Sequence, residues 1–115
     1  MQVQIFGTKK SSETRAALRF FAERRIKTHF VDLNERAASP GELRRFAQKF
    51  GVGALIDSSS AVFQSLGLRH ARMSDESWLG KLVEEPRLLR IPLVRNGSLL
   101  TIGLDEAAWK QWTSK

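Results

Sequence analysis

Short runs of alternating apolar and polar residues predict the strands of this chain. Residues 3–6 are apolar at alternate positions, and residues 29–33 place His29, Val31 and Leu33 on one face of a second strand. Two further apolar pairs, at 93–94 and 99–100, flank Asn96-Gly97. Asn-Gly between apolar runs is typical of a β-hairpin, and it predicts a type I′ turn here.

Apolar stripes with helical spacing follow residues that favour helix starts. Ser11 is predicted to cap a helix that buries Ala17, Leu18, Phe20 and Phe21. Ser39-Pro40-Gly41-Glu42 has the pattern of a capping box with proline at the first helical position. It precedes a predicted buried stripe of Leu43, Phe46, Ala47 and Phe50. We expect further helices at 61–66, after Ser74 and after Asp105, the last packing Trp109 and Trp112 on the sheet.

The order of these elements is β-α-β, three helices, a β-hairpin and a helix. It predicts an α/β fold with one four-stranded mixed sheet flanked by helices. The first two strands are expected to be parallel, joined by a right-handed crossover. The 115 residues are predicted to form a single domain with a helical insertion at about residues 40–84.

The amino-acid composition excludes several kinds of catalytic and metal site. The chain has no cysteine, which excludes a disulfide framework, a zinc ribbon, an iron–sulfur site and thiol catalysis by this chain alone. The formal net charge is +7, with most of the basic excess in the first half. This excess suggests an anionic partner, although Arg-rich helices are more often solvated faces. Neither His29 nor His70 has a second ligand at metal-binding spacing, so we predict no metal site; His29 is expected at the edge of the core.

Three segments carry a family resemblance: residues 5–15, residues 51–68 and residues 85–94. Together they resemble the arsenate reductase-like (ArsC/Spx/YffB) family of the thioredoxin superfamily, in collinear order over nearly the whole chain. The resemblance implies a thioredoxin-like fold with an inserted helical subdomain. It also implies that the peptide bond before Pro92 is cis.

The resemblance also shows where this chain departs from its family. The family's redox cysteine lies in the first loop, four residues before an arginine; here Ser11 holds that position and Arg15 follows. A helix N-terminus and nearby cations lower the pKa of a thiol, whereas a serine hydroxyl stays protonated and forms no mixed disulfide. The three arginines that bind the oxyanion in arsenate reductases align with Asp57, with Ile91 and near Gly103, and none of these is basic.

Without the cysteine and the three arginines, the resemblance still implies a pocket for an anion or a glutathione-type ligand around the first helix. Free N–H groups at the helix start favour an anion, and we expect the ligand-binding residues to come from three segments. The alternative is that Ser11 is only an N-cap and the lysines are solvated. The candidate residues are Lys9, Lys10, Ser11, Ser12, Thr14, Arg15, Arg90, Pro92 and Arg95, none of them catalytic.

We therefore expect a non-catalytic binding or regulatory module. The alternative is a glutathione-dependent thiol or arsenate reductase, which applies if Ser11 replaces a natural cysteine or if a substrate supplies the thiol. No cofactor is predicted, although glutathione is compatible with the resemblance. Spx-like members bind RNA polymerase, so a protein partner of that kind is a further expectation. The sequence predicts a cytoplasmic location, no membrane association and no direct binding of nucleic acid.

Overall fold

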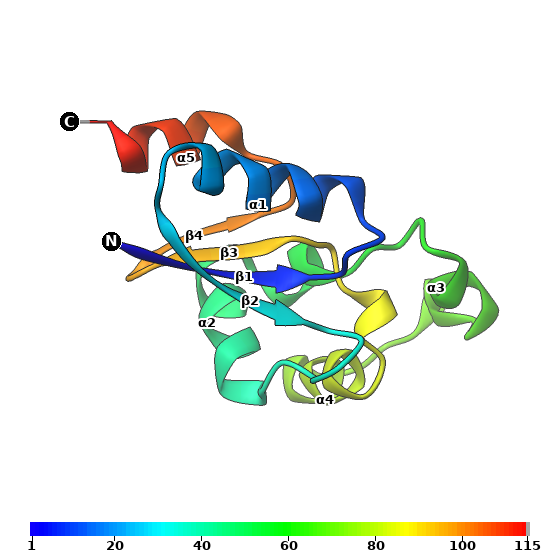
Figure 1. The fold of residues 1–115 in the computed structure, drawn as a ribbon. Helices are drawn as coiled ribbons and strands as arrows, with labels where there is room; N and C mark the ends of the chain where they lie inside the picture. Colours follow the sequence, from blue (N-terminus) through cyan, green and yellow to red (C-terminus); the bar gives the residue numbers. More distant parts are fainter. Residues whose placement is uncertain (115) are drawn as a thin grey trace. The chain divides into compact units, whose positions relative to one another are not determined.

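A computed structural model describes residues 1–114, which divide into two compact units. Among the described residues, unit 1 comprises residues 1–36 and 91–114, and unit 2 comprises residues 37–90. Figure 1 shows the elements in order. They are β1 (Gln2–Gly7), α1 (Ser12–Glu23), β2 (Lys27–Asp32), α2 (Pro40–Phe50), α3 (Ala61–Ser65), α4 (Asp75–Glu84), β3 (Leu93–Asn96), β4 (Leu99–Ile102) and α5 (Glu106–Thr113), with single 3₁₀ turns at Val52–Leu55, Leu68–His70 and Pro86–Leu88.

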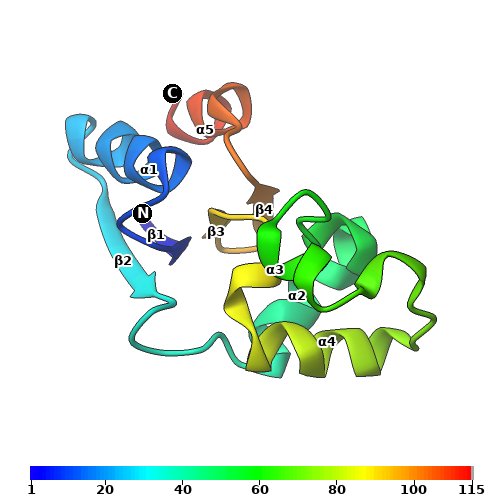
Figure 2. The ribbon, with the colours of Figure 1, turned by 90° about the vertical axis from the view of Figure 1, so that its right-hand side faces the viewer.

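Unit 1 is built on a four-stranded sheet in the order β2-β1-β3-β4. β1 and β2 are parallel, whereas β3 pairs antiparallel with both β1 and β4. The predicted mixed sheet is confirmed. Figures 1 and 2 show α1 and α5 side by side over one face of this sheet.

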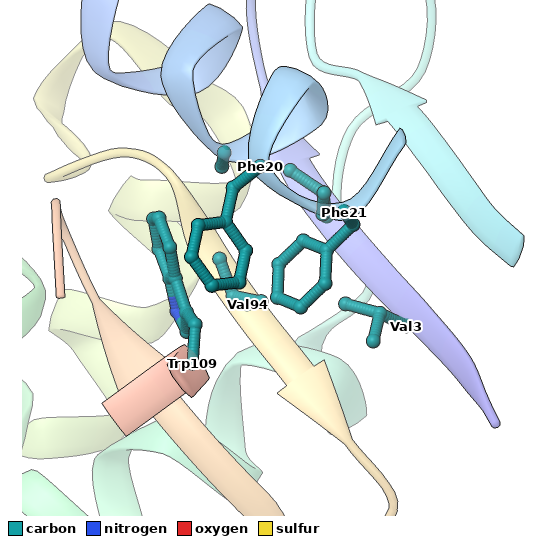
Figure 3. Packing of buried hydrophobic residues seen from close by; sticks show 7 residues of the cluster. Val3, Phe20, Phe21, Val94 and Trp109 are labelled. Atoms are coloured by element: carbon teal, nitrogen blue, oxygen red, sulfur yellow. The ribbon is translucent and has the colours of Figure 1, made fainter. Parts of the chain in front are cut away.

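The core of unit 1 lies between these two helices and the sheet. Val3 and Ile5 of β1 and Val94 of β3 meet Phe20, Phe21 and Trp109, and all six are buried (Figure 3). The Phe20 and Phe21 ring centroids lie 5.5 and 5.6 Å from that of Trp109. The indole N–H of Trp109 donates a 2.9 Å hydrogen bond to the Thr101 hydroxyl, so the ring is fixed by a polar contact as well as by packing.

The hairpin between β3 and β4 forms, but its turn differs from the predicted one. Asn96 pairs with Leu99 within the ladder, so the two loop residues are Gly97 and Ser98. Gly97 has φ of +61°, and neither Asn96 nor Ser98 has positive φ. Positive φ at the first loop residue alone is the pattern of a type II′ turn, whereas type I′ needs it at both. The type I′ prediction is wrong because Asn96 remains in the strand.

Unit 2 is helical. Its first helix, α2, begins with a capping box. The Ser39 hydroxyl accepts from the Glu42 N–H at 3.1 Å, and the Glu42 carboxylate accepts from the Ser39 N–H at 2.8 Å. The predicted capping box is confirmed. α2 buries Leu43 and Phe46, and α4 buries Leu79 and Leu82.

Two residues of the predicted α2 stripe are not buried: Ala47 is half-buried and Phe50 is exposed. Phe50 is 39% exposed and lies 5.3 Å from the Lys49 ammonium, measured from the ring centroid. It is the last residue of the helix, and the chain turns away at Gly51, which has φ of +84°. In both units, no helix within residues 1–114 is long and apolar enough to cross a membrane.

Candidate functional site in the first loop

The loop between β1 and α1 is held in shape by its own backbone. The Ser11 N–H donates to the Thr8 carbonyl at 3.1 Å, which closes a tight turn directly before the helix. Ser11 then has extended dihedrals, φ −75° and ψ 120°, and its hydroxyl accepts from the Thr14 N–H at 3.1 Å. The sequence prediction of Ser11 as N-cap is therefore confirmed.

The start of α1 presents two N–H groups without a partner in the described chain, those of Ser12 and Glu13. Free amides and the helix dipole together favour an anion at such a helix start. Glu13 opposes this effect, because its carboxylate adds negative charge in the first turn. The attraction of this helix start for an anion is therefore smaller than the backbone alone would give.

Arg15 uses its guanidinium to brace the loop. Nη1 donates to the Lys9 carbonyl at 2.9 Å and to the Lys10 carbonyl at 3.2 Å. The side chains of Lys9, Lys10 and Arg15 are exposed. The positive charge of Arg15 is consequently fixed beside the loop, and both lysines extend from the backbone that it holds.

Thr14 connects the helix to the end of β1. It is fully buried, its hydroxyl has no hydrogen-bond partner within residues 1–114, and its side chain lies against Gly7. A Cβ atom built on Gly7 would lie 2.3 Å from Thr14 Oγ1 and 2.6 Å from Cγ2. Sequence reasoning did not single out Gly7, although a glycine ending a strand can mark such a close approach.

Pro92 is buried and follows a cis peptide bond, as the family resemblance implied. The β1–β3 register pairs Phe6 with Leu93, and one further step sets Pro92 opposite Gly7, where the loop begins. The Pro92 carbonyl accepts from the Gly103 N–H at 2.8 Å. Unit 1 thus brings the start of α1, Gly7 and Pro92 to one end of the sheet.

Of the two candidate arginines near Pro92 in the sequence, one lies in unit 1 away from the loop and the other belongs to unit 2. Arg95 is three residues farther along β3, where it pairs with Gln4 and donates from Nε to the Gly97 carbonyl at 2.9 Å. Arg90 belongs to unit 2, where its backbone N–H donates to the Leu55 carbonyl at 2.8 Å and its side chain is exposed. Within unit 1 the loop therefore gathers Lys9, Lys10, Ser11, Ser12, Thr14 and Arg15, with Pro92 alongside.

The sequence has two pairs of adjacent arginines, Arg24-Arg25 at the end of α1 and Arg44-Arg45 in α2, and one arginine of each pair has an intrachain contact. The guanidinium of Arg24 lies 3.6 Å from the Phe20 ring centroid and donates to the Phe20 carbonyl at 3.0 Å. In unit 2, Arg44 forms a 3.1 Å ion pair with Glu76. Two of the four charges thus have structural partners, which leaves less of this charge for an acidic protein.

The topology and the loop together define a class of protein. A parallel β-α-β segment followed by an antiparallel β-hairpin and a helix, with a cis-proline opposite the first loop, is a thioredoxin-like arrangement. Residues 6–112 match the sequence profile of the ArsC family. The chain belongs to the ArsC family.

Individual relatives agree with this assignment. An arsenate reductase from Neisseria meningitidis is 24% identical over 105 residues, covering 89% of this chain and 90% of the relative. The solved arsenate reductase from Vibrio cholerae is 25% identical, with a TM-score of 0.79 and 89% of each chain covered. An ArsC family related protein from Bacteroides fragilis shares the fold at 18% identity, with a TM-score of 0.85 over 96% of this chain and 97% of its own.

Proposed function

We propose that this ArsC-family chain is a binding or regulatory module without thiol redox activity. The observation that carries the proposal is Ser11, whose hydroxyl caps α1 at the position to which the family resemblance assigns the reactive cysteine. An alcohol at a helix start does not become the nucleophilic anion that disulfide exchange needs. The full sequence contains no cysteine that could supply the thiol from another position.

The ligand we propose for the loop is a small anion or a glutathione-type thiol compound. The free Ser12 and Glu13 amides, the exposed Lys9 and Lys10 and the fixed Arg15 guanidinium support this choice. Pro92 supports it too, since the strand register sets it opposite Gly7 at the same end of the sheet. The opposing charge of Glu13 favours weak, millimolar binding.

A reductase assay tests the loss of redox activity. We expect no glutathione-dependent reduction of arsenate above the buffer rate, and turnover above that rate would refute the proposal. Ser11→Cys is the informative variant, because a thiol at this N-cap should form a mixed disulfide with oxidised glutathione, detectable by mass spectrometry. Failure of that variant to react would show that Ser11 does not lie at a redox-competent position.

A ligand titration tests the loop itself. Adding reduced glutathione should shift the amide signals of Ser12 and Glu13 in a saturable way, and Arg15→Ala should abolish the saturation. Arg19→Ala is a matched control, because Arg19 is exposed on the same helix one turn further on. Flat titrations at millimolar glutathione would leave the loop as a structural cap only.

The second candidate function is an enzyme that uses a thiol supplied by its substrate. The same loop supports it, since an anion-binding helix start can stabilise a thiolate that arrives with the substrate. Turnover of a thiol-containing substrate, lost in Arg15→Ala and unchanged in Arg19→Ala, would favour this enzyme over the binding module. A protein partner such as RNA polymerase remains an expectation from Spx-like members, and pull-down at low and high salt tests it.

A further inference from the structure

A second polar site lies on the opposite face of the unit 1 sheet from α1 and α5. Val3 and Ile5 of β1 point into the aromatic core, so Gln2 and Gln4 point to the other face. A cavity of about 360 Å³ opens there, at the lower end of the range for small-molecule sites. Its lining residues are Gln2, Gln4, His29, Arg95 and Gly97.

Strand register explains why these five residues meet. Gln4 pairs with His29 on β2 and with Arg95 on β3, which makes one row of polar side chains across three strands. Gln2 pairs with Lys27 on β2, and two steps beyond the Gln4–Arg95 pair the same register sets Gly97 opposite Gln2. Gly97 has no side chain, so the second row is open at that end.

Arg95 is held in place for a ligand on this face. Its Nε donates to the Gly97 carbonyl at 2.9 Å, and its Nη1 lies 3.5 Å from the Gln4 side-chain oxygen. These two contacts leave N–H donors of the guanidinium unused, and a fixed guanidinium fork matches the geometry of phosphate or carboxylate oxygens. None of the lining residues that the structure describes is acidic.

Charge and size then select the ligand class. Arg95 is permanently charged and Lys27 lies in register beside the cavity, and these two positive charges favour a dianion over a monoanion. The exposed Gln2 amide offers both donors and acceptors to hydroxyl groups. We propose that this cavity binds a small phosphomonoester with a hydroxylated body. This site is separate from the loop around Ser11.

The test is a titration of the whole chain with glycerol phosphate, followed by NMR at constant ionic strength. We expect saturable shifts at the Gln4 and Gly97 amides and at the His29 ring, and none with glycerol alone. Gln2→Glu places a carboxylate in the cavity without changing side-chain length and should weaken binding at least about tenfold. Gln111→Glu is the matched control, because it makes the same charge change at an exposed position of α5.

Arg95→Gln provides a second test and should also lower the affinity at least about tenfold. Shifts confined to Ser12 and Glu13 would overturn this site and support the loop site instead. Equal weakening by Gln2→Glu and Gln111→Glu would overturn it as well, since only bulk charge would then matter. Linear, unsaturated shifts at Gln4, Gly97 and His29 would have the same consequence.

Discussion

Replacing Gly7 with alanine tests how tightly the first loop is packed against α1. The added Cβ would lie 2.3 Å from Thr14 Oγ1, 2.6 Å from Cγ2 and 3.0 Å from Cβ. Gly7 does not have positive φ, so alanine suits its backbone and the added contacts alone decide the outcome. Thr14 is fully buried in the first turn of α1, which limits how far its side chain can move.

The size of the destabilisation caused by Gly7→Ala can be estimated from these contacts. Overpacking a buried site lowers the free energy of unfolding by about 1–3 kcal/mol. Replacing glycine also restricts the unfolded chain, which raises the free energy of unfolding by about 0.4–1 kcal/mol. We expect Gly7→Ala to lower the free energy of unfolding by about 1–2 kcal/mol. In urea, with an m-value of about 2 kcal/mol per M, the midpoint should fall by about 0.5–1 M.

A double-mutant cycle separates this contact from general effects on the strand. Thr14→Ala removes Oγ1 and Cγ2, the two atoms closest to the new methyl group, so the cost of Gly7→Ala should fall by about half or more in that background. Gly80→Ala in α4 is the control, because a Cβ atom at this position would meet nothing within 4 Å. Alanine there should stabilise the helix by up to about 1 kcal/mol. An unchanged cost in the Thr14→Ala background would refute the contact.

Three further predictions concern single interactions. Trp109→Phe should lower the free energy of unfolding by about 1–3 kcal/mol, since it leaves the buried Thr101 hydroxyl without its donor; adding Thr101→Val should recover part of that loss in urea unfolding. Asp105→Ala should cost about 1 kcal/mol by removing the acceptor of the Ala108 N–H, whereas Asp105→Asn should cost only a few tenths; equal costs would argue against capping. The Arg87 guanidinium lowers the pKa of the Glu85 carboxyl, chiefly through a side-chain hydrogen bond at 2.7 Å. Because the folded pKa is the lower one, this pair stabilises the fold above the ordinary glutamate pKa, and the contribution is lost as pH falls through the folded value. Arg87→Gln should raise the pKa of Glu85 in an NMR titration, and an unmoved pKa would contradict this cause.

The parts of the fold that depend on near neighbours could be predicted from the sequence. Ser11, Ser39 and Asp105 each cap the amide three residues later, which is a contact that spacing alone specifies. The parallel pairing of the first two strands and the antiparallel hairpin were predicted from the order of elements, and the cis bond before Pro92 from the family resemblance. The two 3₁₀ turns beside α3 and the one before β3 have no such strong local pattern and were not foreseen.

Features set by the pairing of strands could not be predicted from the sequence pattern. Asn96 remained in its strand because Leu99 pairs with it, which moved the turn by one residue. His29 was expected at the edge of the core, and this is wrong: its side chain is exposed on the face that carries Gln4 and Arg95. Its surroundings depend on which residue of β1 lies opposite, and that pairing joins positions too far apart in sequence for a local pattern to reveal.

The loop around Ser11 shows how the structural and chemical roles of one position can separate. The cap requires only an oxygen that accepts the Thr14 N–H, and serine supplies it at 3.1 Å. Redox chemistry requires a thiolate, which the same helix start and the same Arg15 charge would stabilise. Exchanging sulfur for oxygen therefore preserves the turn at Thr8, the brace from Arg15 and the start of α1, while it removes the nucleophile. The ligand binding that we propose for this loop needs the amides of Ser12 and Glu13, and these have no partner within residues 1–114 when an oxygen caps the helix.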